Sequence, residues 1–187
     1  MRIIQFEVTG MKPGLLMHSP AGMKRTDGPG SGLAKAIPTA ETEAEGGAYR
    51  LPSGQLYIPA YAFRASILTA SKGRKIGKNF ARSIFQSCLF ENGEDMVAPL
   101  YEAGTKAPLS TYEIDVRRVR IGKSGVMRAR AFIQDWACRV SFEYDDERLA
   151  PETIAEVFAI AGKTVGVLDY RPTSSGPFGR YLVELLP

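Results

Sequence analysis

The sequence predicts one α+β domain, and the order of its hydrophobic patterns is the main reason. Apolar and polar residues alternate near the N-terminus, two helical patterns follow, alternating segments come next, and a last helix leads into a final strand. This order of strand, helices, strands, helix and strand is the split βαβ pattern of a ferredoxin-like (RRM-like) fold, in which the first and last strands are sheet neighbours. The 187 residues, 44% of them hydrophobic, suit a single domain over 1–187 with a buried core.

The first half of the chain predicts one strand and two helices around a long insertion. Alternation predicts a strand over 2–9, and the Gly- and Pro-rich residues of about 10–54 predict an irregular loop insertion. Pro59 suits the first turn of a helix over about 60–72, because it has no N–H to donate there. A second helical pattern covers 80–89.

The second half predicts further strands and one more helix. A second insertion over about 91–111 is expected to form a loop or a small hairpin. The hydrophobic phase slips at Arg117-Arg118, which predicts a β-bulge that would turn both arginines off the regular pleat. The turn at 122–125 predicts a hairpin. Strands are expected over 112–121, 126–132, 136–144 and 181–186, and a helix over 151–162.

Basic residues gather in two blocks that contain no Asp or Glu. The formal net charge is only +4, but 46–90 and 116–134 hold basic residues alone among the charged types. Segregation of this kind favours a positive surface that meets phosphates. The candidate phosphate contacts in the two blocks are Arg50, Arg64, Lys72, Arg74, Lys75, Lys78, Arg117 and Arg118.

Two short motifs at opposite ends of the chain also favour contact with a nucleic-acid backbone. Tyr57 to Leu68 reads YIPAYAFRASIL, a short strand that enters a helix through a proline, with an arginine on its first turns. Ser174 to Val183 reads SSGPFGRYLV, a glycine-bearing loop before the last strand. Phosphate binding uses backbone N–H groups that glycine leaves accessible, with guanidinium groups nearby. The predicted contacts in this loop are Gly176, Phe178, Gly179 and Arg180, and Tyr49 and Tyr170 are the candidates for base stacking.

The same two motifs resemble the RAMP proteins of CRISPR systems, and most of all the repeating backbone subunits of effector complexes. Tyr57 to Ala65 resembles their "YIPGSSLKGALR" segment, and Ser175 to Tyr181 is similar to their glycine-rich loop, typically "RGFGR". Met1 to Val8 matches their opening strand. The resemblance implies a role in antiviral defence, with copies of the protein binding side by side along a guide RNA and possible contacts to other effector subunits.

The departures from the family pattern bear on catalysis. Ala60-Tyr61 and Arg64-Ala65 stand where the family has Gly-Ser and Lys-Gly, so a basic side chain is kept. Target-cleaving relatives carry an aspartate in the loop upstream of the first motif, and this chain has Glu45 in that neighbourhood. Asp27 is the only aspartate of the 10–54 insertion, and its position does not identify it as the family's residue.

These observations predict a non-enzymatic protein of the cytoplasm that binds single-stranded nucleic acid, RNA rather than DNA. The insertions at 10–54 and 91–111 would contact neighbouring copies or splay bases apart. One alternative is a metal-independent endoribonuclease of the same superfamily that uses His18, the single histidine. Another is a phage or mobile-element protein that binds or anneals single-stranded DNA. No cofactor, metal site or membrane span is expected, because the two cysteines lack ligand spacing and no apolar run approaches 20 residues.

Overall fold

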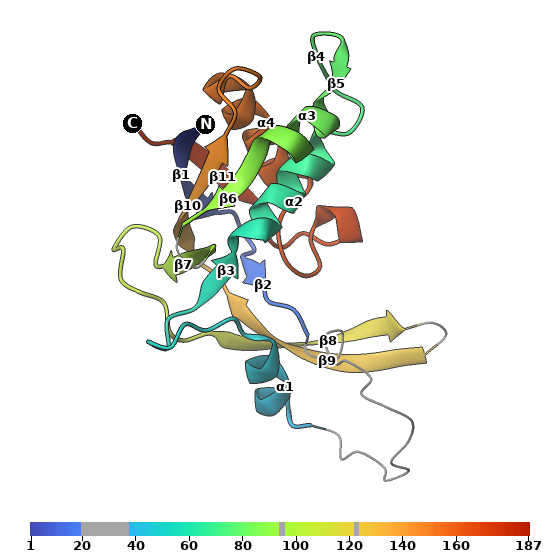
Figure 1. The fold of residues 1–187 in the computed structure, drawn as a ribbon. Helices are drawn as coiled ribbons and strands as arrows, with labels where there is room; N and C mark the ends of the chain where they lie inside the picture. Colours follow the sequence, from blue (N-terminus) through green and yellow to red (C-terminus); the bar gives the residue numbers. More distant parts are fainter. Residues whose placement is uncertain (20–37, 94–95, 122–123) are drawn as a thin grey trace, which may run out of the picture.

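The computed structural model describes residues 1–19, 38–93, 96–121 and 124–187, and this part of the chain is an α+β fold with four α-helices and antiparallel sheets (Figure 1). The strands are β1 (Arg2–Gly10), β2 (Leu15–Leu16), β3 (Tyr57–Pro59), β4 (Lys75–Ile76), β5 (Asn79–Phe80), β6 (Leu89–Asn92), β7 (Val97–Tyr101), β8 (Glu113–Ile121), β9 (Ser124–Ile133), β10 (Ala137–Tyr144) and β11 (Tyr181–Leu185). The helices are α1 (Ala40–Gly47), α2 (Ala60–Ala70), α3 (Ala81–Cys88), α4 (Pro151–Thr164) and the short 3-10 helix η2 (Pro172–Ser174).

The main sheet places the first and last strands of the chain side by side, as the sequence predicts. Its order is β11-β1-β10-β7-β3, and β6 also pairs with β10. The strands β6 and β7 pair with successive parts of β10, at Ser141 to Tyr144 and at Ala137 to Cys138. Because β1 and β11 are antiparallel neighbours, both termini lie at the same edge of the molecule (Figure 1).

One face of the main sheet is covered by helices through a cluster of aromatic rings. Phe158 of α4 contacts Phe6 of β1 and Phe142 of β10 edge to face, with centroids 5.1 and 5.8 Å apart. Phe63 of α2 and Tyr181 of β11 complete the cluster, and all five rings are buried. Burying such a side chain stabilises the fold by about 1.5–3 kcal/mol each, so this cluster fixes the helices to the sheet.

The other face of the main sheet is exposed. We call it the open face and define it by Ile3, Glu7, Arg139, Leu182 and Glu184. Glu7 lies directly opposite Arg139 on β10 and Glu184 on β11, so these side chains share one face. Arg139 donates from Nε to Glu7 at 2.9 Å, and Ile3 and Leu182 are largely exposed. The open face therefore combines acidic and apolar side chains with one arginine, which is paired with Glu7.

A second sheet, β2-β9-β8, carries a long hairpin that projects away from the core with α1 beneath it (Figure 1). Beyond β2, the edge of β9 is closed by Glu43 of α1, whose carboxylate accepts the N–H of Ala129 at 3.1 Å and a hydrogen bond from Arg128 at 3.2 Å. A buried carboxylate thus satisfies a backbone donor that would otherwise lack a partner strand.

Three expectations about local structure need correction. The pairing of β8 with β9 runs without a break from Glu113 to Ile121, so the bulge predicted at Arg117-Arg118 is wrong. The 10–54 insertion is not wholly irregular, because it contains β2 and α1, and its residues 20–37 lie outside the described residues. The 91–111 insertion contributes β7 to the main sheet rather than a separate hairpin. The hairpin predicted at 122–125 forms, although residues 122 and 123 of its turn lie outside the described residues.

Candidate nucleic-acid interface

The regular pairing of the β8–β9 hairpin sends its two candidate arginines to opposite faces. Successive side chains alternate across a strand, so Arg117 and Arg118 cannot share a face. Arg117 faces the segment between α4 and β11 (residues 165–180), which we call the C-terminal loop, and its guanidinium lies 4.5 Å from the ring centroid of Phe178 there. Its Nε donates to Asp115 of the same strand at 2.6 Å. Arg118 is exposed on the outer face, beside Met127.

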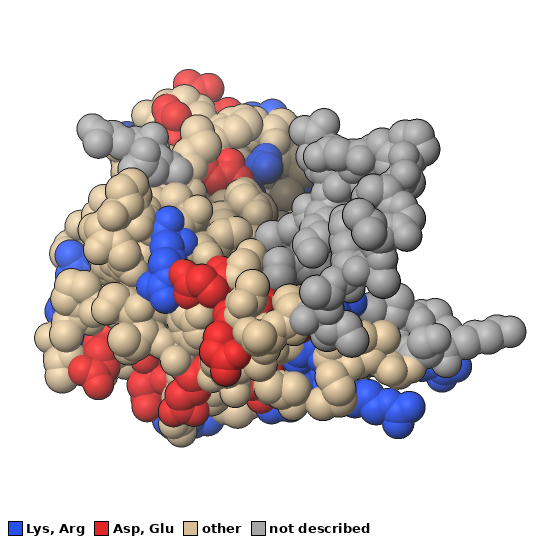
Figure 2. Space-filling model, turned by 90° about the horizontal axis from the view of Figure 1, so that it is seen from below, with Lys and Arg blue, Asp and Glu red and all other residues tan. Residues whose placement is uncertain are grey.

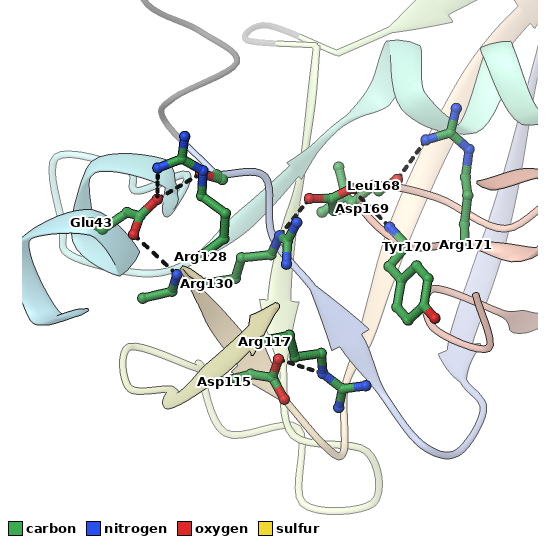
Figure 3. Close-up of polar contacts among 11 residues, drawn as sticks. Glu43, Asp115, Arg117, Arg128, Arg130, Leu168, Asp169, Tyr170 and Arg171 are labelled. Carbon is green, nitrogen blue, oxygen red and sulfur yellow. Dashed lines mark hydrogen bonds and ion pairs between the residues drawn. The ribbon is translucent and has the colours of Figure 1, made fainter. Parts of the chain in front are cut away.

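An ion pair ties the C-terminal loop to the base of the hairpin. Arg130 on β9 donates from Nε to Asp169 Oδ2 at 2.6 Å (Figure 3). The Arg130 side chain is only 8% exposed and that of Asp169 is 29% exposed. The second oxygen of Asp169 accepts the N–H of Tyr170, and the N–H of Asp169 donates to Leu16 on β2. The loop is therefore fixed to the hairpin by charge and to β2 by its backbone.

Between the hairpin and this loop lies a groove of about 460 Å³, which we call the hairpin groove. Four arginines line it from the hairpin side, and a tyrosine and a serine line it from the loop side. Its lining residues are Arg117, Arg118, Val119, Arg120, Arg130, Asp169, Tyr170 and Ser174. A groove with guanidinium groups on one wall and an aromatic ring on the other is suited to a single nucleic-acid strand.

A second cavity, of about 220 Å³, lies next to the N-terminal half of α2, and we call it the helix pocket. It is lined by His18, by Tyr61 of α2 and by Arg171 of the C-terminal loop, among others. Burial lowers the pKa of His18, and Arg171 and Arg130 lower it further, while Asp169 opposes them. The imidazole is therefore neutral at neutral pH. Its ring packs edge to face on Tyr49, with centroids 6.3 Å apart.

The glycines of the C-terminal loop allow close backbone packing. A Cβ on Gly176 would lie 1.9 Å from the carbonyl oxygen of Tyr170, and one on Gly179 would lie 2.0 Å from that of Val167. The N–H groups of Gly176 and Gly179 donate to the carbonyls of Arg171 and Gly14. These amides are used inside the chain, so they do not form the phosphate-binding nest that the sequence suggested, and a role of this loop in binding stays a prediction.

Three of the candidate arginines hold the fold together. Arg50 forms a bidentate ion pair with Glu45 and also donates to two backbone carbonyls. Arg64 donates to the carbonyls of Gln86 and Leu89 at the end of α3, at 2.9 and 2.6 Å. Arg180 donates to the carbonyls of Lys12 and Pro177. In each case the guanidinium donors bind groups of the protein itself and help to hold loops and helix ends in place.

The remaining candidates lie far from the hairpin groove. Lys72, Arg74, Lys75 and Lys78 surround the small β4–β5 hairpin, at the opposite end of the molecule from β8–β9 (Figure 1). Arg74 pairs with Glu156 of α4 at 3.2 Å, and the Lys75 ammonium lies 5.8 Å from the ring centroid of Phe80. The two basic blocks of the sequence thus do not merge into one surface. We call residues 72–80, which contain β4 and β5, the distal basic hairpin.

Charges on the underside of the molecule are also unevenly distributed. Figure 2 shows acidic side chains over the lower left and centre and at the top of this face, and basic side chains at the lower right, on the side toward which the β8–β9 hairpin extends in Figure 1, as well as at the left and left of centre. The end of this face toward the hairpin is therefore basic, although it does not hold all of the basic side chains in view.

Sequence reasoning missed the residues that complete the hairpin groove. Arg130 lies in the second basic block, but nothing local distinguished it from its neighbours. Asp169 and Ser174 belong to a loop whose partner strand is 39 or more residues away, as the Arg130–Asp169 pair shows. Within the described residues, no group of three or more His, Cys, Asp or Glu side chains is arranged to hold a metal ion. None of the described helices is long and apolar enough to cross a membrane.

Comparison with known proteins finds likeness at the level of structure. No protein-family model matches the sequence, and no curated protein matches it significantly. The structure matches a chain of the type III-B Cmr-beta complex bound to cognate target RNA, with a TM-score of 0.60 and 14% identity. The match covers 98% of this chain but 60% of that one, so this chain is similar to about three fifths of the larger subunit. The fold is therefore that of part of a chain in a type III-B effector complex, which agrees with the resemblance to RAMP proteins that the two sequence motifs indicate.

Proposed function

We propose that this protein is a non-enzymatic RAMP-superfamily subunit of a CRISPR effector complex that binds single-stranded RNA in the hairpin groove. The observation that carries the proposal is the groove itself, because arginines of the hairpin and Tyr170 of the C-terminal loop line one channel on a fold shared with a subunit of an RNA-bound complex. Copies of the protein would bind side by side along a guide RNA in the cytoplasm, together with other effector subunits.

The proposed domain is a single ferredoxin-like unit over residues 1–187 with insertions. Its core would consist of β1, β6, β10 and β11 with the helices α2 and α4. The order β11-β1-β10-β6 and the antiparallel pairing of each neighbour support this assignment. The projecting β8–β9 hairpin would be an insertion that supplies the binding surface.

The charges of the sheet support the choice of the groove over the open face. Many RRM-like domains bind RNA on the exposed face of the sheet through aromatic side chains. Here that face presents Glu7 and Glu184 as direct cross-strand neighbours. Arg139 pairs with Glu7, but Glu184 adds a second carboxylate to this face, so acidic side chains outnumber the one arginine that defines it and disfavour a phosphate backbone. The strand would therefore lie along the arginines of the hairpin instead.

A binding titration tests this function. The purified protein is titrated against fluorescently labelled RNA and DNA strands of one sequence at several salt concentrations. We expect the logarithm of the association constant to fall linearly with the logarithm of the salt concentration, by about 0.7 per phosphate contact, and RNA to compete better than DNA. No binding to any single strand, or an affinity independent of salt, would contradict the proposal. Stronger competition by DNA would favour the single-stranded-DNA alternative.

One observation favours the endoribonuclease alternative enough to test it. A neutral imidazole can accept a proton, and His18 lies in the helix pocket together with Arg171, a cation that could neutralise a phosphate. No acid–base partner is hydrogen-bonded to His18 among the described contacts, so we favour binding alone. RNA cleavage by the parent protein that disappears in His18→Ala, with binding intact, would reverse this choice.

A further inference from the structure

The most unusual feature of the hairpin groove is a stack of flat side chains with one exposed end. Phe178 is 3% exposed, with the Arg117 guanidinium 4.5 Å from its centroid and the Phe132 ring edge-on at 6.0 Å. The ring of Tyr170 lies 6.0 Å from Phe178 and is tilted by only 30°. Tyr170 is 39% exposed and lines the groove. Arg117 and Phe132 thus both contact the buried Phe178. Tyr170 is the member of the group whose ring is accessible to a ligand in the groove.

The backbone around Tyr170 is held in a conformation that side chains disfavour. Tyr170 has φ +46°, and Leu168 and Ser175 in the same loop have φ +59° and +62°. A left-handed residue other than glycine costs about 1–2 kcal/mol, and such residues persist only where their surroundings enforce them. Three such residues within eight positions lower the stability of the loop, which indicates that its conformation serves a function.

The contacts that enforce this conformation fix the backbone of Tyr170, from which the ring projects. The N–H of Tyr170 donates to Asp169 Oδ1 at 2.9 Å, and its carbonyl accepts the N–H of Phe178 at 3.2 Å. Asp169 is in turn held by Arg130. The carbonyl of Tyr170 also approaches Gly176 so closely that no Cβ would fit there. The fixed backbone thus presents a ring that is 39% exposed instead of burying it in the core.

The surroundings of the ring define the chemistry of the missing partner. Arg117 and Arg118 are among the hairpin residues that line the groove and supply positive charge to it, and Ser174 lines it from the same loop as Tyr170. A flat, sequence-tolerant π-face next to phosphate-binding cations matches one unstacked nucleobase with its flanking phosphates. An acidic peptide would satisfy the arginines but would leave the ring without a flat partner.

We propose that Tyr170 is a stacking platform that holds one unstacked base of the bound strand in the hairpin groove. This inference rests on the proposed function and adds to it the place where a base leaves the regular stack. Because every base has a π-face, the platform takes any of them. It therefore contributes affinity and register without sequence preference.

The test replaces the ring while keeping the backbone. Tyr170→Asn removes the aromatic ring, and asparagine tolerates the left-handed region better than other ring-free residues. Tyr170→Phe keeps the ring. Phe80→Ala is the matched control, because Phe80 is 63% exposed and lies on the distal basic hairpin. Oligonucleotides carrying the fluorescent base 2-aminopurine at successive positions report stacking as a loss of fluorescence, and thermal melts check that each variant is folded.

We expect one position of the strand to show strong quenching with the parent protein, with Tyr170→Phe and with Phe80→Ala. In Tyr170→Asn the quenching should disappear and the affinity should fall by about 5- to 150-fold, the range measured for loss of one stacked base. The salt dependence should not change, because stacking releases no counterion. Unchanged quenching and affinity in a folded Tyr170→Asn would overturn the inference alone. Failure of the parent protein to bind any strand would overturn the proposed function as well.

Discussion

Replacing Arg118 by glutamine tests the most specific consequence of the fold, namely that the two basic blocks are separate surfaces. Arg118 is exposed on the β8–β9 hairpin and lines the hairpin groove. Arg118→Gln removes one charge with little change in volume. Lys78→Gln makes the same change in charge on the distal basic hairpin and is the matched control.

The expected magnitude follows from counterion release. Each phosphate contact on a single strand contributes about −0.7 to the slope of log K against log salt. Arg118→Gln should therefore make the slope of log K against log salt less steep by about 0.7. Raising the salt from 50 to 200 mM would then weaken binding by the variant about 2.6-fold less than it weakens binding by the parent. On a strand of about six nucleotides, which is within the site size of a single binding fold, Lys78→Gln should leave the slope unchanged.

Fluorescence anisotropy at four or five salt concentrations measures both slopes. A second series with a long strand shows whether the distal basic hairpin joins when the strand can reach it, in which case Lys78→Gln lowers the slope there only. If both variants reduce the slope equally on the short strand, the charges act as one diffuse field. The separation of the two surfaces would then have no functional meaning, and the groove would lose its special role.

Four further outcomes follow from the structure. Asp169→Asn leaves Arg130 buried without its counter-charge and should lower the free energy of unfolding by about 2–3 kcal/mol in urea titrations, whereas Arg130→Met added to it should recover much of that loss. Burial raises the pKa of Glu7, but hydrogen bonds from its neighbours outweigh burial and hold that pKa below its ordinary value of 4.5. The stability that Glu7 contributes is therefore present above about pH 4.5 and is lost as the pH falls through its lower folded pKa, and Glu7→Gln should flatten this acid limb of the urea midpoint. His18→Ala should bind strands like the parent, with no cleavage by either protein in a gel assay. Light scattering on strands of increasing length should show protein multiples that track the strand, and a parent that stays monomeric on long strands would contradict side-by-side assembly.

The elements that could be predicted from the sequence are those with one face in the core. In β1, Phe6 and Val8 are buried while their neighbours are not, so alternation marks the strand. In α4, Ile154, Val157, Phe158 and Ala161 are buried at helical spacing, with Pro151 at the start. Local periodicity reflects burial directly at such elements, and it needs no knowledge of which partner covers the face.

The β8–β9 hairpin shows where that logic fails. The hairpin packs against the C-terminal loop and against α1 at its base and is otherwise exposed, so Val116 is 49% exposed while Arg130 is buried. Apolar and charged residues therefore occur on both faces, and the change of phase at Arg117-Arg118 resembled a bulge although the pairing is regular. A projecting strand pair does not obey a periodicity that assumes one buried face.

The candidate site was predictable in composition but not in position. The sequence identified Arg117, Arg118 and Tyr170 by charge and by their place in loops or strands, and all three line one groove. It could not show that Arg50 and Arg64 hold the fold together, because a guanidinium binds a carbonyl, a carboxylate or a phosphate with the same donors. Which of these an arginine meets depends on segments brought together from 5 to more than 20 residues away.

The division of the arginines between structure and surface bears on how the protein would work. Because several guanidinium groups are used inside the chain, the described groove offers only a small number of cations to a strand. Few phosphate contacts give one copy modest affinity at physiological salt. Binding of several copies along one strand raises the overall affinity without any new type of contact, provided that neighbouring copies are spaced to engage it together. A small basic groove repeated along an assembly would thus be sufficient for the proposed binding, even though the net charge of the chain is only +4.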